Sequence, residues 1–141
     1  MAAARADSSR PARKGRILIV DDEEGIRELL KAILEADYHI AEADSGAALL
    51  LALEKEAADV VLLDMHLPDA NGLHLLPAIK QRWPATQVIM LSGTPNDGGT
   101  KSWAAESVKN GAFGFLSKSA EFSFPQVLDC VSSAVAVRRD G

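Results

Sequence analysis

Short apolar runs alternate with longer amphipathic segments along most of the chain, and this alternation restricts the fold more than any other feature. The short runs have the length and composition of β-strands, whereas the segments between them have helical spacing. In the first such segment, apolar residues at helical spacing form one face of an amphipathic helix: Ile26, Leu29, Leu30, Ile33 and Leu34. The five expected strands lie at about 16–20, 38–42, 59–63, 86–91 and 113–116.

Five strand–helix units in regular order predict an α/β fold, with a parallel sheet covered by helices on both faces. The runs 16–20 and 59–63 are continuously apolar, which is typical of central strands buried on both sides. Helix signals divide the rest of the chain. We expect helices over 26–34, from Ser45 to near Glu56, from Asn71 or Gly72 to about Arg82, over 100–110 before Gly111, and after a Ser123-x-x-Gln126 capping box.

Length and composition indicate one globular domain outside the membrane. The chain has 141 residues, of which 48% are hydrophobic and 25% are charged. No apolar stretch approaches the length of a membrane span, and the N-terminus lacks the apolar core of a signal peptide. Cys130 is the single cysteine, which excludes an internal disulfide and agrees with a reducing compartment. We therefore expect a cytoplasmic protein.

Charge is distributed unevenly along the sequence. Residues 1–16 hold five basic residues and one acid, whereas the remaining 125 residues hold 19 acids and 10 bases. An acidic body argues against nucleic-acid binding by the domain itself. We expect a flexible basic tail over residues 1–15, the folded domain over 16–138 and a short C-terminal end over 139–141.

Polar side chains gather at the ends of the expected strands. Asp21 and Asp22 follow the first, Asp64 closes the third, Ser92 closes the fourth, and Lys118 follows the fifth. In parallel sheets, sites form at the carboxyl ends of the strands. Close carboxylates resist full ionisation unless a cation lies among them, and oxygen ligands suit Mg²⁺. A divalent ion beside a carboxylate is what phosphoryl transfer would need. Taken alone, Asp22 could instead cap the following helix, and Lys118 could be a surface charge.

Four motifs in this order resemble the receiver domain of bacterial two-component response regulators. They are Ile-Leu-Ile-Val-Asp21-Asp22-Glu23, Leu-Leu-Asp64-Met-His-Leu-Pro68-Asp-Ala-Asn-Gly72, Met-Leu-Ser92-Gly93 and Gly111-Ala-Phe-Gly-Phe115-Leu-Ser-Lys118. The resemblance covers roughly residues 16–137. It implies a single doubly wound (βα)5 domain of the flavodoxin-like type, with a five-stranded parallel sheet of order 2-1-3-4-5.

The resemblance also implies a chemistry. Asp64 would accept a phosphoryl group from a sensor histidine kinase or a phosphotransfer protein. Asp22, Asp64 and the main-chain carbonyl of His66 would bind Mg²⁺ directly, and Asp21 would hold it through water. Ser92 and Lys118 would contact the phosphoryl group. Such a chain is a phosphoacceptor with self-catalysed transfer and dephosphorylation rather than a turnover enzyme.

Signalling would follow from the same contacts. Ser92 would move toward the phosphoryl group, and Phe115, at the family's aromatic switch position, would turn into the vacated space. The face formed by helix 100–110, strand 113–116 and the last helix would then control an output partner or domain, with a homodimer as a further option. His66 and Thr94 would tune how fast water reaches the acyl phosphate. The segment 16–93 looks most like receivers that precede transcriptional output domains.

Two departures from the family pattern leave an alternative open. Ser119 stands where the family usually has a cis proline, and a non-proline cis bond costs about 3 kcal/mol, so we expect a trans bond or a reshaped loop. The segment 94–100 is longer than usual. Both features suit an interaction module that keeps the fold but signals without phosphate. A phosphohydrolase with an aspartyl-phosphate intermediate would carry its nucleophile after the first strand, which the position of Asp64 disfavours.

Overall fold

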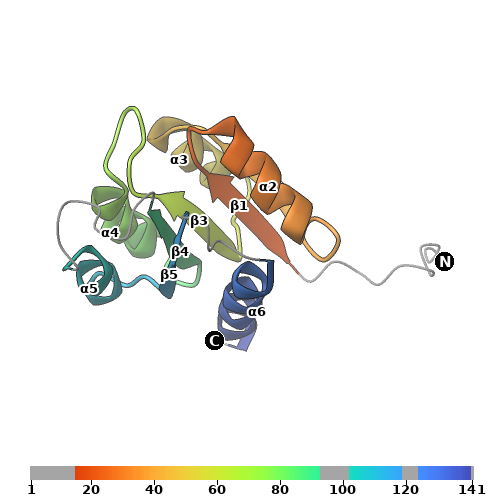
Figure 1. The fold of residues 1–141 in the computed structure, drawn as a ribbon. Helices are drawn as coiled ribbons and strands as arrows, with labels where there is room; N and C mark the ends of the chain where they lie inside the picture. The colour runs from red at the N-terminus through yellow and green to blue at the C-terminus, as the bar shows by residue number, and fades with distance from the viewer. Residues whose placement is uncertain (1–14, 93–101, 119–123, 141) are drawn as a thin grey trace.

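In the computed structural model, five parallel strands form one sheet with helices on both faces (Figure 1). The structure describes residues 15–92, 102–118 and 124–140. The strands are β1 (Arg16–Val20), β2 (His39–Ala43), β3 (Val60–Asp64), β4 (Gln87–Ser92) and β5 (Gly114–Ser117). Their order in the sheet is β2-β1-β3-β4-β5. The predicted fold class and strand order are therefore confirmed, and each expected strand lies within one residue of its observed position.

Among the described residues, five helices connect or follow the strands, and their labels begin at α2 as in Figure 1. They are α2 (Glu24–Leu34), α3 (Gly46–Lys55), α4 (Gly72–Arg82), α5 (Ser102–Lys109) and α6 (Phe124–Asp140). Ser45 caps α3 as predicted, because its hydroxyl accepts a hydrogen bond from the Ala48 amide at 3.1 Å. After α5, Gly111 has a φ of +104°, a conformation that favours glycine. The predicted capping box at Ser123 lies outside the described residues.

The alternation of side chains along the strands produces two separate cores, one on each face of the sheet. On one face, α2 and α6 pack against residues such as Ile19 and Leu62. On the other face, α3 and α4 pack against their chain neighbours Leu18 and Leu63. Figure 1 shows these two helical layers. Because β3 is covered on both sides, all five of its residues are buried, which confirms its predicted central place.

The strand register brings the predicted polar residues to one edge of the sheet. Val20 pairs with Leu63 across β1 and β3, so that Asp21 and Asp64 follow at the same level. Asp64 pairs with Leu91 of β4, and Ser92 pairs with Ser117 of β5. Lys118 therefore emerges from β5 beside the end of β4. The topology alone thus gathers side chains that are up to 97 residues apart in the sequence.

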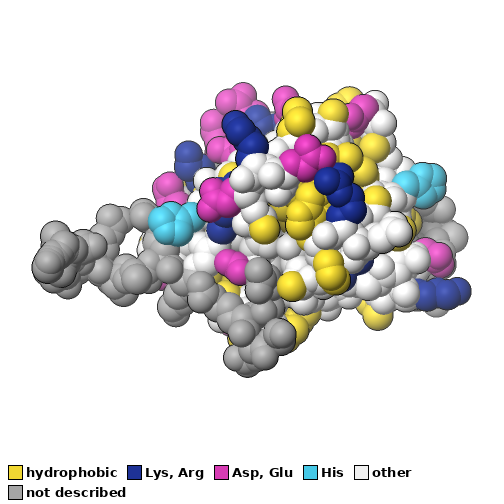
Figure 2. Space-filling view, turned by 180° about the vertical axis from the view of Figure 1, so that it is seen from behind, with side chains coloured by type: hydrophobic (Ala, Val, Ile, Leu, Met, Phe, Trp, Pro, Cys, Tyr) yellow, Lys and Arg dark blue, Asp and Glu magenta, His cyan; other side chains and the backbone are white. Residues whose placement is uncertain are grey.

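Apolar side chains also reach the surface. Figure 2 shows one face of the molecule, where hydrophobic side chains gather near the centre and charged side chains surround them. Leu51 of α3 is 64% exposed, whereas Leu62 of β3 is fully buried. Within the described part of the chain, no helix is long and apolar enough to cross a membrane.

These two leucines give a matched test of the packing. We expect Leu62→Ala to lower the free energy of unfolding by about 3 kcal/mol, because it removes buried contacts and leaves a cavity between β3 and the α2–α6 layer. Leu51→Ala should change it by no more than about 0.5 kcal/mol. Urea unfolding followed by circular dichroism measures both, and equal losses would contradict the assignment of β3 to the core.

Candidate functional site

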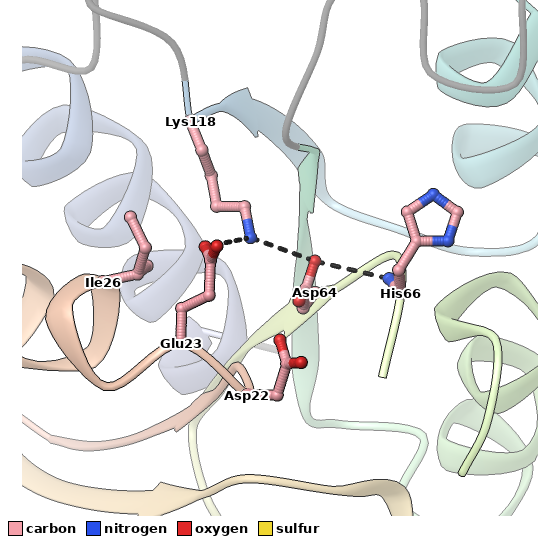
Figure 3. Close-up of a pocket in the computed structure, with 6 residues that line it drawn as sticks. All are labelled: Asp22, Glu23, Ile26, Asp64, His66 and Lys118. Atoms are coloured by element: carbon pink, nitrogen blue, oxygen red, sulfur yellow. Dashed lines mark hydrogen bonds and ion pairs between the residues drawn. The ribbon is translucent and has the colours of Figure 1, made fainter. Parts of the chain in front are cut away.

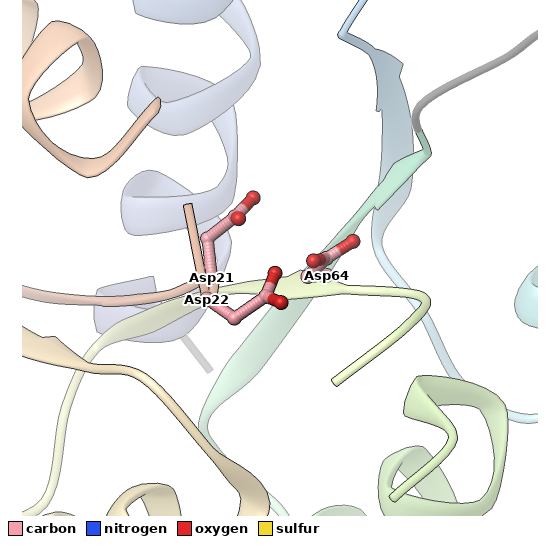
Figure 4. A group of neighbouring side chains, drawn as sticks. All are labelled: Asp21, Asp22 and Asp64. Atoms are coloured by element: carbon pink, nitrogen blue, oxygen red, sulfur yellow. The ribbon is translucent and has the colours of Figure 1, made fainter. Parts of the chain in front are cut away.

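Three carboxylates meet at the carboxyl edge of the sheet. Asp64 is the last residue of β3 and is only 3% exposed. Asp21 follows β1 and is fully buried, whereas Asp22 is exposed. One oxygen from each of these side chains lies within 4.8 Å of the others (Figure 4). The structure therefore brings together three acids that the sequence places at the ends of two strands.

Lys118 lies against this cluster (Figure 3). Its ammonium nitrogen is 2.9 Å from an oxygen of Asp21 and 3.2 Å from an oxygen of Asp64. A third contact, at 3.4 Å, reaches Glu23. Since the lysine side chain is only 8% exposed, the ammonium is largely screened from water by its partners. Lys118 thus reaches the acids, although the expected rearrangement at Ser119 lies outside the described residues.

Glu23 was not among the residues predicted from the sequence to act at the site. Its signal was its place directly after the aspartate pair, but a third acid there is equally typical of a first helical turn. It is the N-cap residue of α2 and makes no capping hydrogen bond with its side chain. The Asp21 carboxylate instead accepts a hydrogen bond from the Glu23 amide at 2.8 Å. The alternative that Asp22 caps this helix finds no support, because the N-cap residue is Glu23.

A pocket of about 400 Å³ opens beside the cluster. The residues that line it are Asp22, Glu23, Ile26, Asp64, His66 and Lys118. The amide of His66 donates a hydrogen bond to Asp64 at 3.3 Å, and the His66 side chain is exposed at the pocket rim. A polar group several atoms in size could enter this pocket and reach the Asp64 carboxylate.

Two features determine the pKa values of Asp64 and Lys118: both side chains are buried, and a single lysine faces several acids. Burial and the negative charge of Asp21 raise the pKa of Asp64 to about 6, although Lys118 and the His66 amide act in the opposite direction. Burial lowers the pKa of Lys118, but its contacts with Asp21 and Asp64 outweigh burial and raise that pKa above its usual value. Lys118 therefore stays protonated, and the site keeps a net negative charge.

The loop after β3 closes tightly onto Asp64. The Gly72 amide donates to the Met65 carbonyl at 2.8 Å, and His66 and Asn71 form an isolated antiparallel bridge. A Cβ atom at Gly72 would collide with the Asp64 carbonyl, which explains the glycine at this position. The loop is thus a compact hairpin that starts and ends beside Asp64.

The remaining predicted residues lie at the edges of this site. Ser92 is buried at the end of β4. Phe115 of β5 is 46% exposed, so its ring faces outward. Thr94 and the segment 94–100 lie outside the described residues.

Comparisons with known proteins agree with this geometry. The family model for the response regulator receiver domain matches residues 17–127. The chain belongs to this family. It is 38% identical to the response regulator protein PilR of Pseudomonas aeruginosa over 126 residues, which cover 87% of this chain and 26% of PilR. It is 31% identical to the chemotaxis protein CheY of Halobacterium salinarum, covering 85% of this chain and 96% of CheY.

Among solved structures, the beryllofluoride-activated receiver domain dimer of NtrC4 matches with a TM-score of 0.78 and 32% identity, covering 87% of this chain and 98% of the NtrC4 chain. The chain thus spans nearly all of CheY and of the NtrC4 domain but about a quarter of PilR. The receiver is therefore the part that these relatives share.

The raised pKa of Asp64 predicts a pH-dependent stability. Asp64 binds its proton more tightly in the folded state, where its pKa is about 6, than in the unfolded state, where its pKa has the ordinary value of 3.8. Its ionisation therefore destabilises the fold progressively from about pH 4 to about pH 6 and fully above that range. Without divalent cations, we expect Asp64→Asn to raise the free energy of unfolding by about 1–3 kcal/mol at pH 7.5, and this gain should vanish below pH 4.

Urea unfolding at several pH values measures this effect. Asp44→Asn, which removes an exposed acid, is the control and should change the stability little at any pH. A gain for Asp64→Asn that is the same at pH 3.5 and pH 7.5 would contradict the proposed cause.

Proposed function

We propose that this receiver domain accepts a phosphoryl group on Asp64 from a histidine kinase or a phosphotransfer protein, in a reaction that requires Mg²⁺. The observation that carries the proposal is a nearly buried carboxylate at a strand end, with two further acids, a lysine and an open pocket beside it. Membership of the receiver family supports it independently.

The donor atoms at this edge fit a magnesium ion. All three side chains of the cluster offer oxygen, which Mg²⁺ prefers, and their oxygens already lie within 4.8 Å of one another. Asp22, Asp64 and the His66 carbonyl would hold the ion, with Asp21 acting through water. When bound, the ion offsets the repulsion between the acids and an incoming phosphoryl group.

Asp64 acts as the nucleophile in this proposal. One of its carboxylate oxygens attacks the phosphorus atom, and the bond from phosphorus to the donor imidazole nitrogen breaks. Lys118 is already 3.2 Å from Asp64 and can pair with the phosphoryl oxygens after transfer. The buried Ser92 hydroxyl donates a hydrogen bond to the same group.

In this proposal the phosphoryl group stays bound to the protein's own Asp64 until water removes it, and no separate substrate is converted and released. His66 at the pocket rim and Thr94 would set how fast water reaches the acyl phosphate. We therefore propose a phosphoacceptor that dephosphorylates itself, not a turnover enzyme.

We propose that the readout is the surface of α5, β5 and α6. Phosphorylation adds nearly two negative charges beside Ser92 and Lys118, which lie at the ends of β4 and β5. Phe115 and Val108 are large apolar residues exposed on β5 and α5, and a partner that contacts one conformation only would sense the change.

The partner would be an output domain, another protein or a second copy of the chain, as in the NtrC4 receiver dimer. The net charge of −5 and the acidic cluster disfavour nucleic acid as a direct ligand of this domain. We further propose a cytoplasmic location, where two-component kinases present their phosphoryl groups.

Intact-mass measurements after incubation with acetyl phosphate test the proposed function. We expect the wild-type chain to gain one phosphoryl group with Mg²⁺ and none with EDTA, because the repulsion of the acids is then unopposed. Asp64→Ala should gain none, whereas the control Asp44→Asn should behave as wild type.

Time points from seconds onward separate a missing reaction from a rapid hydrolysis. A folded wild-type chain that shows no adduct at any time point would contradict the proposal and favour the phosphate-independent interaction module. Steady release of phosphate from aryl phosphates would instead indicate a turnover enzyme.

The proposed switch predicts a movement of Phe115. Because the ring is 46% exposed in this structure, activation should bury it against the space that Ser92 leaves. Spectra of ¹³C-labelled phenylalanine, recorded with Mg²⁺ before and after adding beryllofluoride as a phosphoryl mimic, would show new contacts to aliphatic side chains. Phe113, on the segment before β5, provides an internal reference. If Phe115 keeps its rotamer while the mimic binds, this route of signalling fails.

A further inference from the structure

The loop that follows the phosphoacceptor has a second anchor away from the site. At its tip, Leu67 and Ala70 exchange backbone hydrogen bonds of 3.0 and 3.4 Å, which makes a tight turn through Pro68 and Asp69. The Asp69 side chain extends from this turn to the first residues of α3. It accepts hydrogen bonds from the Gly46 amide at 2.8 Å and the Ala47 amide at 3.0 Å, one with each carboxylate oxygen.

These contacts join two segments that are 23 residues apart in the sequence. The first amides of a helix have no partner within the helix, and a negative charge is favourable there. In α3, Ser45 satisfies the Ala48 amide, while Asp69 satisfies the two amides before it. The same two amides lower the pKa of Asp69, so its carboxylate is ionised at neutral pH. The helix end therefore holds the loop, and the loop completes the cap of the helix.

The loop and the start of α3 are closely packed around this anchor. A Cβ atom at Gly46 would come within 3.2 Å of the Ala70 Cβ atom and 3.3 Å of an Asp69 oxygen. The glycine thus permits the close approach of the loop to the helix. At its other end the loop is fixed by the hydrogen bond from Gly72 to Met65.

His66 lies between these two fixed points. Its amide donates to the Asp64 carboxylate, and its carbonyl is the main-chain oxygen assigned above to the magnesium ion. Both groups belong to the backbone, so no side chain can correct their orientation if the loop moves. The position of His66 therefore depends on what holds the loop.

We infer that Asp69 is a positioning residue for the phosphoacceptor site: its contacts with Gly46 and Ala47 hold the loop on α3 and keep the His66 backbone beside Asp64. The inference rests on the proposed function for its meaning in catalysis. The geometric part, that Asp69 fixes the His66 amide, stands independently of any metal or phosphate.

The chain offers matched controls for the test. Asp69→Ala removes the anchor, and Asp69→Asn keeps one acceptor oxygen for the two amides. Ser45→Ala removes the other cap of the same helix without touching the loop, at a cost of about 1 kcal/mol of stability. Asp44→Asn removes an exposed negative charge just before the same helix. All four variants and the wild type are compared as folded full-length chains.

The first measurement is hydrogen exchange of the His66 amide in the metal-free protein. We expect faster exchange in Asp69→Ala and unchanged exchange in Ser45→Ala and Asp44→Asn. The second is isothermal titration with Mg²⁺, where Asp69→Ala should bind about 10-fold more weakly than wild type, Asp69→Asn should fall between them, and the two controls should match wild type. Phosphorylation by acetyl phosphate should be slower in Asp69→Ala than in wild type, and this difference should be largest at low Mg²⁺.

Each contrary result has a distinct meaning. If Asp69→Ala matches wild type in exchange and in Mg²⁺ affinity, the inference is overturned while the proposed function stands. If Ser45→Ala loses as much His66 amide protection and Mg²⁺ affinity as Asp69→Ala, the effect comes from the stability of α3. If Asp44→Asn shows the same losses, the effect comes from charge. Either result overturns the inference. A wild-type chain that neither binds Mg²⁺ nor gains a phosphoryl group overturns the proposed function, whereas the exchange result then still decides the geometric part.

Discussion

The contact of the Lys118 ammonium with Asp21 and Asp64 is the interaction on which the arrangement of the site depends. These three side chains come from the ends of β5, β1 and β3, and all of them are almost completely buried. A buried carboxylate without a partner is costly, and a buried pair is tolerated when its geometry and hydrogen bonds are good. A sheet of parallel strands with β1 and β3 adjacent brings the three groups within reach, because their carboxyl ends lie at one edge. The order β2-β1-β3-β4-β5 meets this condition.

One lysine does not neutralise the site. Lys118 faces Asp21, Asp64 and Glu23, while Asp22 stands exposed beside them. The excess of negative charge has two consequences with a common origin. It contributes to the raised pKa of Asp64, so that the ionised site weakens the fold, and it favours a further cation such as the proposed magnesium ion. The folded chain thus carries an unfavourable electrostatic energy at the carboxyl edge of the sheet, which hydrophobic packing elsewhere must offset.

Most of the fold could be predicted from the sequence because each signal is local and periodic. The continuous apolar run ending at Asp64 marks a central strand, and Ser45 marks the start of a helix. The Glu23 amide is bonded by Asp21 rather than by Asp22, a choice between neighbouring carboxylates that the sequence leaves open. Glu23 and Asp69 were missed as contributors because neither stands at a strand end, and their partners lie 95 and 23 residues away, where spacing along the chain carries no signal.

The site divides its tasks between two kinds of support. Asp64 is held by β3, which is buried along its whole length, and the Lys118 backbone is held at the end of β4, where its amide donates to the Ser92 carbonyl at 2.7 Å. The His66 backbone lies in a loop outside the sheet, so its position must be fixed by specific hydrogen bonds. Gly72 supplies one at the base of the loop, and Asp69 supplies two at its tip. A chain that changed only the tip would keep its fold and its acids, yet would hold the ligand-facing backbone less firmly. For this reason the acidic cluster alone is an incomplete description of what a working receiver requires.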